Sequence, residues 1–126
     1  KKFIKIVTDI LLVIVLVMAA VLYIPRLMGL KTYKVLSGSM EPEYHVGSVV
    51  YVEKSSIDDI EVGDVITFYI NENTVVTHRV IDKDNDTESF HTKGDANETE
   101  DGGSVAYDKV VGKVVLNVPY LGYILR

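Results

Sequence analysis

The stretch "DVITFYINENTVVTHRVI", residues 64–81, decides the fold of this chain. Two runs rich in β-branched and aromatic residues, 64–70 and 74–81, flank the polar triplet "NEN" at 71–73. Such runs are typical of strands, and a connection this short joins antiparallel neighbours. The sequence therefore predicts a β-hairpin in the middle of the chain.

Similar short apolar runs lie on both sides of this hairpin. Three more strands are predicted, at "GSVVYVEK" (47–54), "SFHTKG" (89–94) and "KVVGKVVLNV" (109–118). Polar loops are predicted between the strands, with a single helical turn possible in the first, at 55–64, 82–89 and 94–104. The expected fold class is mainly β, a small antiparallel sheet that forms one domain over residues 27–126.

The beginning of the chain has a different pattern. Residues 3–24, "FIKIVTDILLVIVLVMAAVLYI", would make a helix about 33 Å long, close to the thickness of the hydrocarbon core. Lys5 and Asp9 are four residues apart, where they partly neutralise each other, and Pro25 ends the run. We predict a membrane anchor at 1–26 with one transmembrane helix. A cleaved signal peptide and a buried helix of a soluble protein are the alternatives.

Charge is distributed unevenly over the 126 residues, whose formal net charge is −5. Residues 1–34 carry six Lys or Arg and one acid, and the other seventeen acids lie beyond residue 40. This pattern suggests a basic, membrane-associated start and an acidic soluble body, and it argues against binding to nucleic acid. The chain has no cysteine, which excludes disulfides and thiolate metal sites.

The stretch "VLSGSMEP", residues 35–42, raises the question of catalysis. Gly38 allows a tight turn between Ser37 and Ser39, which would leave the second hydroxyl exposed. Serine becomes a nucleophile only when a base removes its proton and donors stabilise the oxyanion. The simpler interpretation is an ordinary turn at the end of a strand.

Three histidines are candidates for the base. His45 shares the loop of the serines, and His91 is expected on a strand face. His78 is flanked on its own strand face by Val76 and Val80, which would desolvate it partly and hold it rigidly. These properties suit a general base near neutral pH, although a histidine on an apolar strand face is more often structural.

A carboxylate usually orients such a base. The acidic loop 94–104 offers Asp95 and Asp101, with Glu98 and Glu100 beside them. A solvated loop and a calcium site are the competing interpretations, and the spacing of an EF-hand is absent.

The motifs "SGSM", "GDV", "THRV" and "TKGD", in this order after one apolar segment, resemble those of type I signal peptidases. Members of that family are membrane-bound serine proteases that remove signal peptides from exported proteins. The resemblance covers about residues 8–123. The ordinary bacterial branch has a lysine where this chain has His78, so the chain resembles the endoplasmic-reticulum type, which archaea and some Gram-positive bacteria share.

The resemblance implies a role for each matching residue. Ser39 would be the nucleophile, His78 the general base and Asp101 the acid that completes the site. Asp95, the aspartate of "KGD", would be a second important acid. Ser37 and the backbone amide of Ser39 would form the oxyanion hole. The chain reads "GDANETED" where relatives often have Asn-Asn after Gly-Asp, which leaves the division of roles between the two aspartates open.

The resemblance also implies substrates and location. Preproteins with small residues at the first and third positions before the cut would bind in an extended conformation as an added strand. Met40 would contribute an apolar substrate-binding face toward the lipid bilayer, and no metal or organic cofactor would be needed. The body would lie outside the cytoplasm, at the cell membrane or at the endoplasmic reticulum membrane of a eukaryote.

Two other classes of function stay open from the sequence. A membrane-tethered β-domain could bind a partner at the surface without catalysis, but it would not account for the ordered serine, histidine and aspartate. A self-cleaving repressor-type protease would need a lysine base and a DNA-binding head. His78 in "THRV" is the feature that separates these alternatives. The predicted partners are preprotein signal peptides and the lipid bilayer, with accessory membrane subunits left open.

Overall fold

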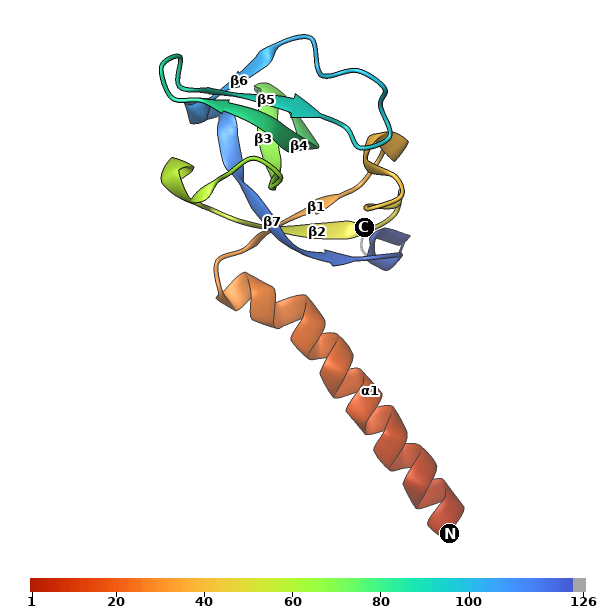
Figure 1. Cartoon of the computed structure of the whole chain (residues 1–126). Coiled ribbons are helices and arrows are strands. Elements are labelled where there is room, and N and C mark those ends of the chain that lie inside the picture. The colour runs from red at the N-terminus through yellow and green to blue at the C-terminus, as the bar shows by residue number, and fades with distance from the viewer. Residues whose placement is uncertain (124–126) are drawn as a thin grey trace. The chain divides into compact units, whose positions relative to one another are not determined.

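The computed structural model of the chain describes residues 1–123, which form one α-helix, four short 3₁₀ helices and a seven-stranded sheet (Figure 1). The chain divides into two compact units, Lys1–Lys31 and the remainder from Thr32 onward. The boundary that the sequence suggested, after residue 26, stays a prediction.

The first unit is helix α1 (Lys2–Leu27), which contains the predicted span 3–24. Its most apolar window has a mean hydropathy of 2.8, so its length and composition would allow it to cross a membrane. The prediction that Pro25 ends the helix is wrong, since the helix continues for two residues beyond it. The N–H of Met28 still finds the carbonyl of Ile24, and the chain turns away only at Gly29, whose φ is +82°.

The second unit is mainly β, as predicted. Its strands are β1 (Lys31–Lys34), β2 (Val49–Glu53), β3 (Val65–Asn71), β4 (Thr74–Asp84), β5 (Ser89–Lys93), β6 (Ser104–Ala106) and β7 (Val110–Val118). They follow the order β1-β2-β7-β3-β4-β5-β6 across the sheet, and the pairs from β2 to β6 are antiparallel. The short strands β1 and β6 were not predicted, because "KTYK" and "SVA" offer too few apolar positions.

The central hairpin is confirmed. Strand β3 pairs with β4 so that Ile66 lies opposite His78, and the chain turns between Asn71 and Thr74. Strand β4 is longer than predicted, because its second half continues to Asp84 and pairs with β5. The predicted loop at 82–89 is therefore shorter than expected.

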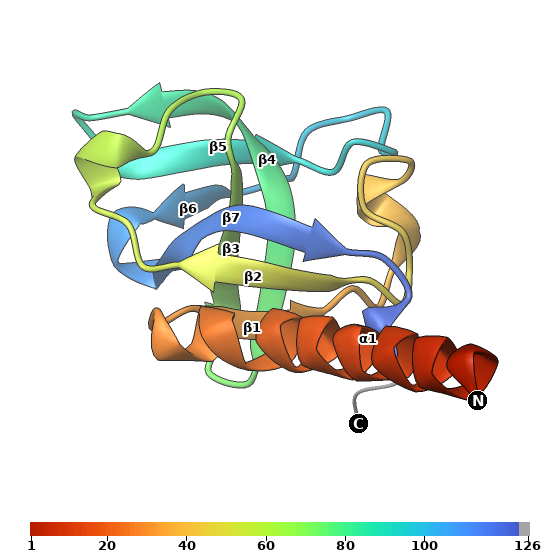
Figure 2. The same ribbon diagram turned by 90° about the horizontal axis from the view of Figure 1, so that it is seen from below.

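Side chains of β3, β4, β5 and β6, together with Ile60 from the loop before β3, form the main core. Its buried members are Ile60, Ile66, Phe68, Val80, Phe90 and Val105. Strand β7 lies beside β2 and also pairs with β3 (Figures 1 and 2). A Cβ at Gly112 would lie 2.1 Å from the carbonyl oxygen of Glu53, so only glycine permits the close approach of β7 to β2.

Two features of this sheet position the site. Residues 74–78 of β4 pair with β3 on one edge, and pairing with β5 on the other edge begins only at Arg79. The loop after β1 lies beside the loop after β5 in both views (Figures 1 and 2), and the Ala96 N–H donates to the carbonyl oxygen of Ser39 at 2.8 Å. The sheet thus brings residues 74–78 of β4, the loop after β1 and the loop after β5 close together.

Candidate active site

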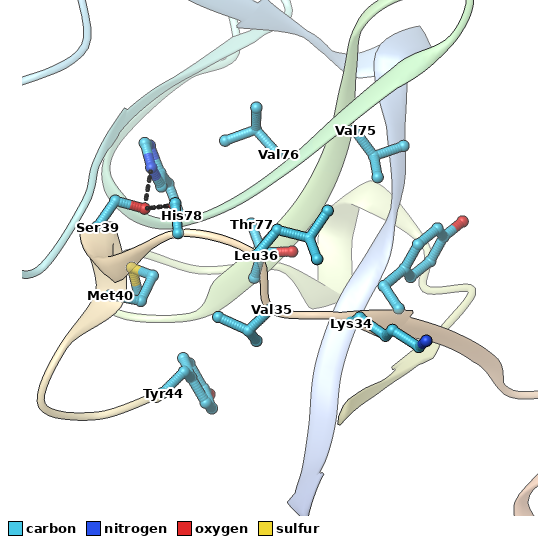
Figure 3. Close-up of a pocket in the computed structure, with 12 residues that line it drawn as sticks. Lys34, Val35, Leu36, Ser39, Met40, Tyr44, Val75, Val76, Thr77 and His78 are labelled. Carbon is cyan, nitrogen blue, oxygen red and sulfur yellow. Dashed lines mark hydrogen bonds between the residues drawn. The ribbon is translucent and has the colours of Figure 1, made fainter. Parts of the chain in front are cut away.

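Ser39 lies in a 3₁₀ turn, Gly38–Met40, that follows the extended residue Ser37. Met40 is buried and fixes the end of this turn, with its sulfur 3.4 Å from the N–H of Asp95. The carbonyl of Ser39 is held by Ala96, while its hydroxyl points toward His78 (Figure 3). The turn therefore holds the backbone of Ser39 in place and leaves its hydroxyl available.

His78 lies on β4 and is only 8% exposed. Its ring meets Phe68 edge-on, with the ring centroids 6.4 Å apart. Its Nε2 lies 3.1 Å from the hydroxyl of Ser39, and its Nδ1 lies 2.6 Å from Oδ2 of Asp101. An ionised carboxylate only accepts hydrogen bonds, so Nδ1 carries the proton and Nε2 is free to accept one from Ser39.

Asp101 lies near the end of the acidic loop, where the backbone comes back beside β5. Its N–H donates to the carbonyl of Thr92 at 2.9 Å, and its Oδ2 also accepts a hydrogen bond from the Thr92 hydroxyl at 2.6 Å. The structure thus brings Ser39, His78 and Asp101 into one chain of hydrogen bonds. This arrangement can carry a proton from a hydroxyl to an imidazole that a carboxylate orients.

Asp95 has a different partner. Both of its oxygens accept hydrogen bonds from Arg79, at 2.9 Å from Nε and 2.8 Å from Nη2. The Arg79 guanidinium holds the pKa of Asp95 below its usual range, and the same hydrogen bonds raise the pKa of Arg79. Arg79 also donates to the carbonyl of Gly63 at 2.8 Å. The pair ties the acidic loop to β4.

The remaining predicted residues surround Ser39. The hydroxyl of Ser37 lies 3.1 Å from that of Ser39. Met40 and both serines border a groove of about 400 Å³ that reaches His78. Figure 3 labels Ser39, Met40 and His78 in this groove. The groove is lined by Tyr33, Lys34, Val35, Leu36, Ser37, Ser39, Met40, Tyr44, Val75, Val76, Thr77 and His78. Burial raises the pKa of Tyr44 in this lining, so its phenol stays neutral near neutral pH.

The other candidates lie apart from this chain of hydrogen bonds. His45 pairs with Glu41 inside its own loop, and His91 lies opposite Asp82 in the β4–β5 pairing. Among residues 1–123, no group of three His, Cys, Asp or Glu side chains is placed to hold a metal ion.

Sequence reasoning missed three residues that shape the site: Thr92, Arg79 and Gly94. Thr92 and Arg79 bind the two aspartates, and a Cβ at Gly94 would lie 2.7 Å from the carbonyl oxygen of Ser39. All three lie within or beside "THRV" and "TKGD", but the motifs alone do not say which side chains meet.

Comparison with known proteins identifies the family. Residues 7–89 match the model of the family described as "Signal peptidase, peptidase S26". The chain belongs to this family. The matched range contains Ser39 and His78 but ends before Asp95 and Asp101, so the family match does not assign the acid.

Individual relatives agree with the predicted branch. Signal peptidase I W of Bacillus subtilis is 38% identical, over a match that covers 84% of this chain and 63% of the relative. The human signal peptidase complex catalytic subunit SEC11C is 36% identical over 71% of this chain and 53% of its own length. The occurrence of both a Gram-positive and an animal relative confirms the resemblance to the branch that they share. The chain spans between half and two thirds of the length of these relatives.

Proposed function

We propose that this chain is a membrane-bound serine endopeptidase that removes signal peptides from exported preproteins. The observation that carries the proposal is the chain of hydrogen bonds from Ser39 through His78 to Asp101, with distances of 3.1 and 2.6 Å. Membership of the signal peptidase family supplies the class of reaction. The oriented hydroxyl, imidazole and carboxylate are the parts that acyl transfer to serine requires.

In the proposed mechanism, Oγ of Ser39 attacks the scissile carbonyl carbon while its proton passes to Nε2 of His78. The C–N bond then breaks, and the leaving amine takes that proton. Water hydrolyses the acyl-serine with His78 as base again. Asp101 keeps the proton of the ring on Nδ1 and stabilises the imidazolium. No metal or organic cofactor takes part.

Ser37 is proposed to support the oxyanion. Its hydroxyl lies beside that of Ser39, so a carbonyl oxygen bound next to Ser39 would be within reach of it. The backbone N–H of Ser39 is proposed as the second donor. Two such donors stabilise the negative charge that develops on the carbonyl oxygen.

The groove is proposed to bind the residues before the cut. Residues 74–78 of β4 pair with no other strand on the edge away from β3, within the described part of the chain. An extended peptide could hydrogen-bond to this edge as an added strand and reach Ser39 with its carbonyl. Met40 and Val76 line the groove near His78, which suits small apolar side chains (Figure 3).

Helix α1 is proposed as a retained transmembrane anchor, with the sheet outside the cytoplasm. Most of its apolar side chains are exposed in this structure, as lipid-facing side chains would be. Signal peptides are cut on the far side of the membrane, so the basic start of the chain would stay inside. Protease added to intact spheroplasts should digest the body, and a body protected until lysis would contradict this topology.

The direct test is cleavage of a signal-bearing preprotein by the chain in detergent. We expect the wild-type chain to release the signal peptide, and Ser39→Ala to release none while keeping the same melting temperature. Ser37→Ala is the matched control, because it removes a neighbouring hydroxyl and should retain slow cleavage. Undiminished cleavage by Ser39→Ala would contradict the proposal.

A further inference from the structure

The buried hydroxyl of Thr92 has a specific partner. Thr92 lies on β5 with no exposed surface, and its face of the strand also carries Phe90 of the core. A buried hydroxyl costs stability unless it is hydrogen-bonded, so an apolar side chain would be expected at such a position. The hydroxyl instead donates to Oδ2 of Asp101 at 2.6 Å.

That oxygen is the one that holds His78. Oδ2 of Asp101 accepts both from the Thr92 hydroxyl and from Nδ1 of His78, each at 2.6 Å. The side chain of Asp101 is 28% exposed and follows seven loop residues, 94–100, after the end of β5, and the last torsion of an aspartate has broad preferences. Without a second donor, rotation of the carboxylate would weaken its hold on the imidazole.

Thr92 is well placed to prevent this rotation. Its strand pairs with β4, where Thr92 lies opposite Val80, and with β6. Its carbonyl accepts a hydrogen bond from the N–H of Asp101 at 2.9 Å, so Thr92 is hydrogen-bonded to both the backbone and the side chain of Asp101. Only the hydrogen bond to the side chain of Asp101 depends on the Thr92 hydroxyl.

We propose that Thr92 is a positioning residue, whose hydroxyl fixes the carboxylate of Asp101 in the orientation that directs His78 toward Ser39. This inference rests on the proposed function, in which Asp101 orients the base. Thr92 does not line the groove beside Ser39, although it borders a second cavity of about 280 Å³ with His78 and Asp101. Its side chain is fully buried, so we expect its hydroxyl to act on the reaction step and not on peptide binding.

The test compares Thr92→Val, which keeps the shape and the backbone hydrogen bond, with Thr92→Ser, which keeps the hydroxyl. A hydrogen bond to a charged group predicts a loss of kcat of about 10- to 100-fold for Thr92→Val, with KM little changed. Thr92→Ser should restore most of the activity. Thr67→Val is the matched control, because Thr67 is also fully buried and hydrogen-bonded, to Thr77 at 2.7 Å on another pair of strands.

A second measurement shows whether Thr92 acts through Asp101. In an Asp101→Asn background, Thr92→Val should change kcat by less than about threefold, because residues that act as one unit are not additive. If Thr92→Val does not fold, Thr92→Ala gives the same comparison with a smaller side chain.

Several outcomes would overturn the inference. These are a wild-type kcat in Thr92→Val, an equal loss in Thr92→Ser, and an undiminished loss in the Asp101→Asn background. If Ser39→Ala still cleaves, the proposed function itself fails, which is a separate result from a wild-type kcat in Thr92→Val.

Discussion

Asp95 and Asp101 belong to one loop, yet their carboxylates hold different parts of the molecule. Asp101 is bonded to His78 and Thr92, whereas Asp95 is bonded to Arg79 through both oxygens. His78 and Arg79 are neighbours on β4, and neighbouring side chains of a strand point to opposite faces. The two acids of this loop therefore bind side chains on opposite faces of β4.

In the proposed mechanism, this difference gives Asp101 a part in the reaction and Asp95 a structural part. The face with Asp101 contains the imidazole and the hydroxyl of Ser39, and the face with Asp95 contains a permanent cation. Between the two acids, the loop touches the backbone of Ser39 through Ala96. We therefore expect substitutions at the two aspartates to differ in size and in kind.

The largest effect is expected for Asp101→Asn. An amide cannot hold the proton on Nδ1 in the same way or stabilise the imidazolium, so kcat should fall by about 10⁴-fold. Cleavage rates of the preprotein, measured with purified protein in detergent, check this. Equal losses of kcat in Asp101→Asn and Asp95→Asn would show that the two aspartates do not differ in role.

The next effect is expected for Gly94→Ala, at the beginning of the loop. The added methyl would lie 2.7 Å from the carbonyl oxygen and 3.1 Å from Cβ of Ser39, so Ser39 or the loop must shift. A displacement of about 1 Å costs up to about 10²-fold in rate. Gly102→Ala on the same loop is the control, since its methyl meets no atom within 4 Å. A normal rate for Gly94→Ala would show that the loop does not position Ser39.

A smaller effect on cleavage is expected for Asp95→Asn. Loss of the two charge-assisted hydrogen bonds to Arg79 should lower the free energy of unfolding by about 1–3 kcal/mol. The cleavage rate should fall by less than about tenfold, because the partners of His78 are unchanged. Denaturant unfolding and initial rates measured on the same samples check both parts. A large loss of rate with unchanged stability would assign Asp95 to the chemistry.

The smallest effect expected is a loss of stability at low pH. Arg79 lowers the pKa of folded Asp95 below the unfolded value of about 3.9, so the pair stabilises the fold above that pH. The contribution is lost as pH falls through the folded pKa. The stability difference between wild type and Asp95→Asn should therefore be constant from pH 5 to 7 and shrink below about pH 4. A difference that persists at pH 2 would show that charge on Asp95 is not its source.

Particular residues show how far the sequence predicted the fold. The β3–β4 hairpin followed from its apolar runs and its polar turn, since local pattern determines such elements. The end of β4 at Asp84 could not be predicted in this way, because residues 82–84 are polar and are stabilised by pairing with β5. Pro25 inside α1 is a similar case. Proline is expected to end a helix, but α1 continues past it because later N–H groups, such as that of Met28, still have helical acceptors.

The site was also only partly predicted from the sequence. Ser39, His78 and both aspartates were selected from motifs, and their assigned roles stay predictions. That Asp101 meets His78 while Asp95 meets Arg79 follows from the path of the loop over β4, which no residue type specifies. Thr92 and Gly94 stand inside the quoted motif, but their contacts with Asp101 and Ser39 exist only after folding.

By itself, the sequence determined an apolar helix, a mainly β body and a set of residues suited to acyl transfer, because each depends on local composition and order. Only the tertiary structure decided which carboxylate reaches the imidazole and which binds the guanidinium. Hydrogen bonds form over about 3 Å, and the segments that carry these groups lie 23 residues apart for His78 and Asp101 and 39 residues apart for Ser39 and His78. Such distances are fixed by the pairing of strands, which turns separated motifs into one site.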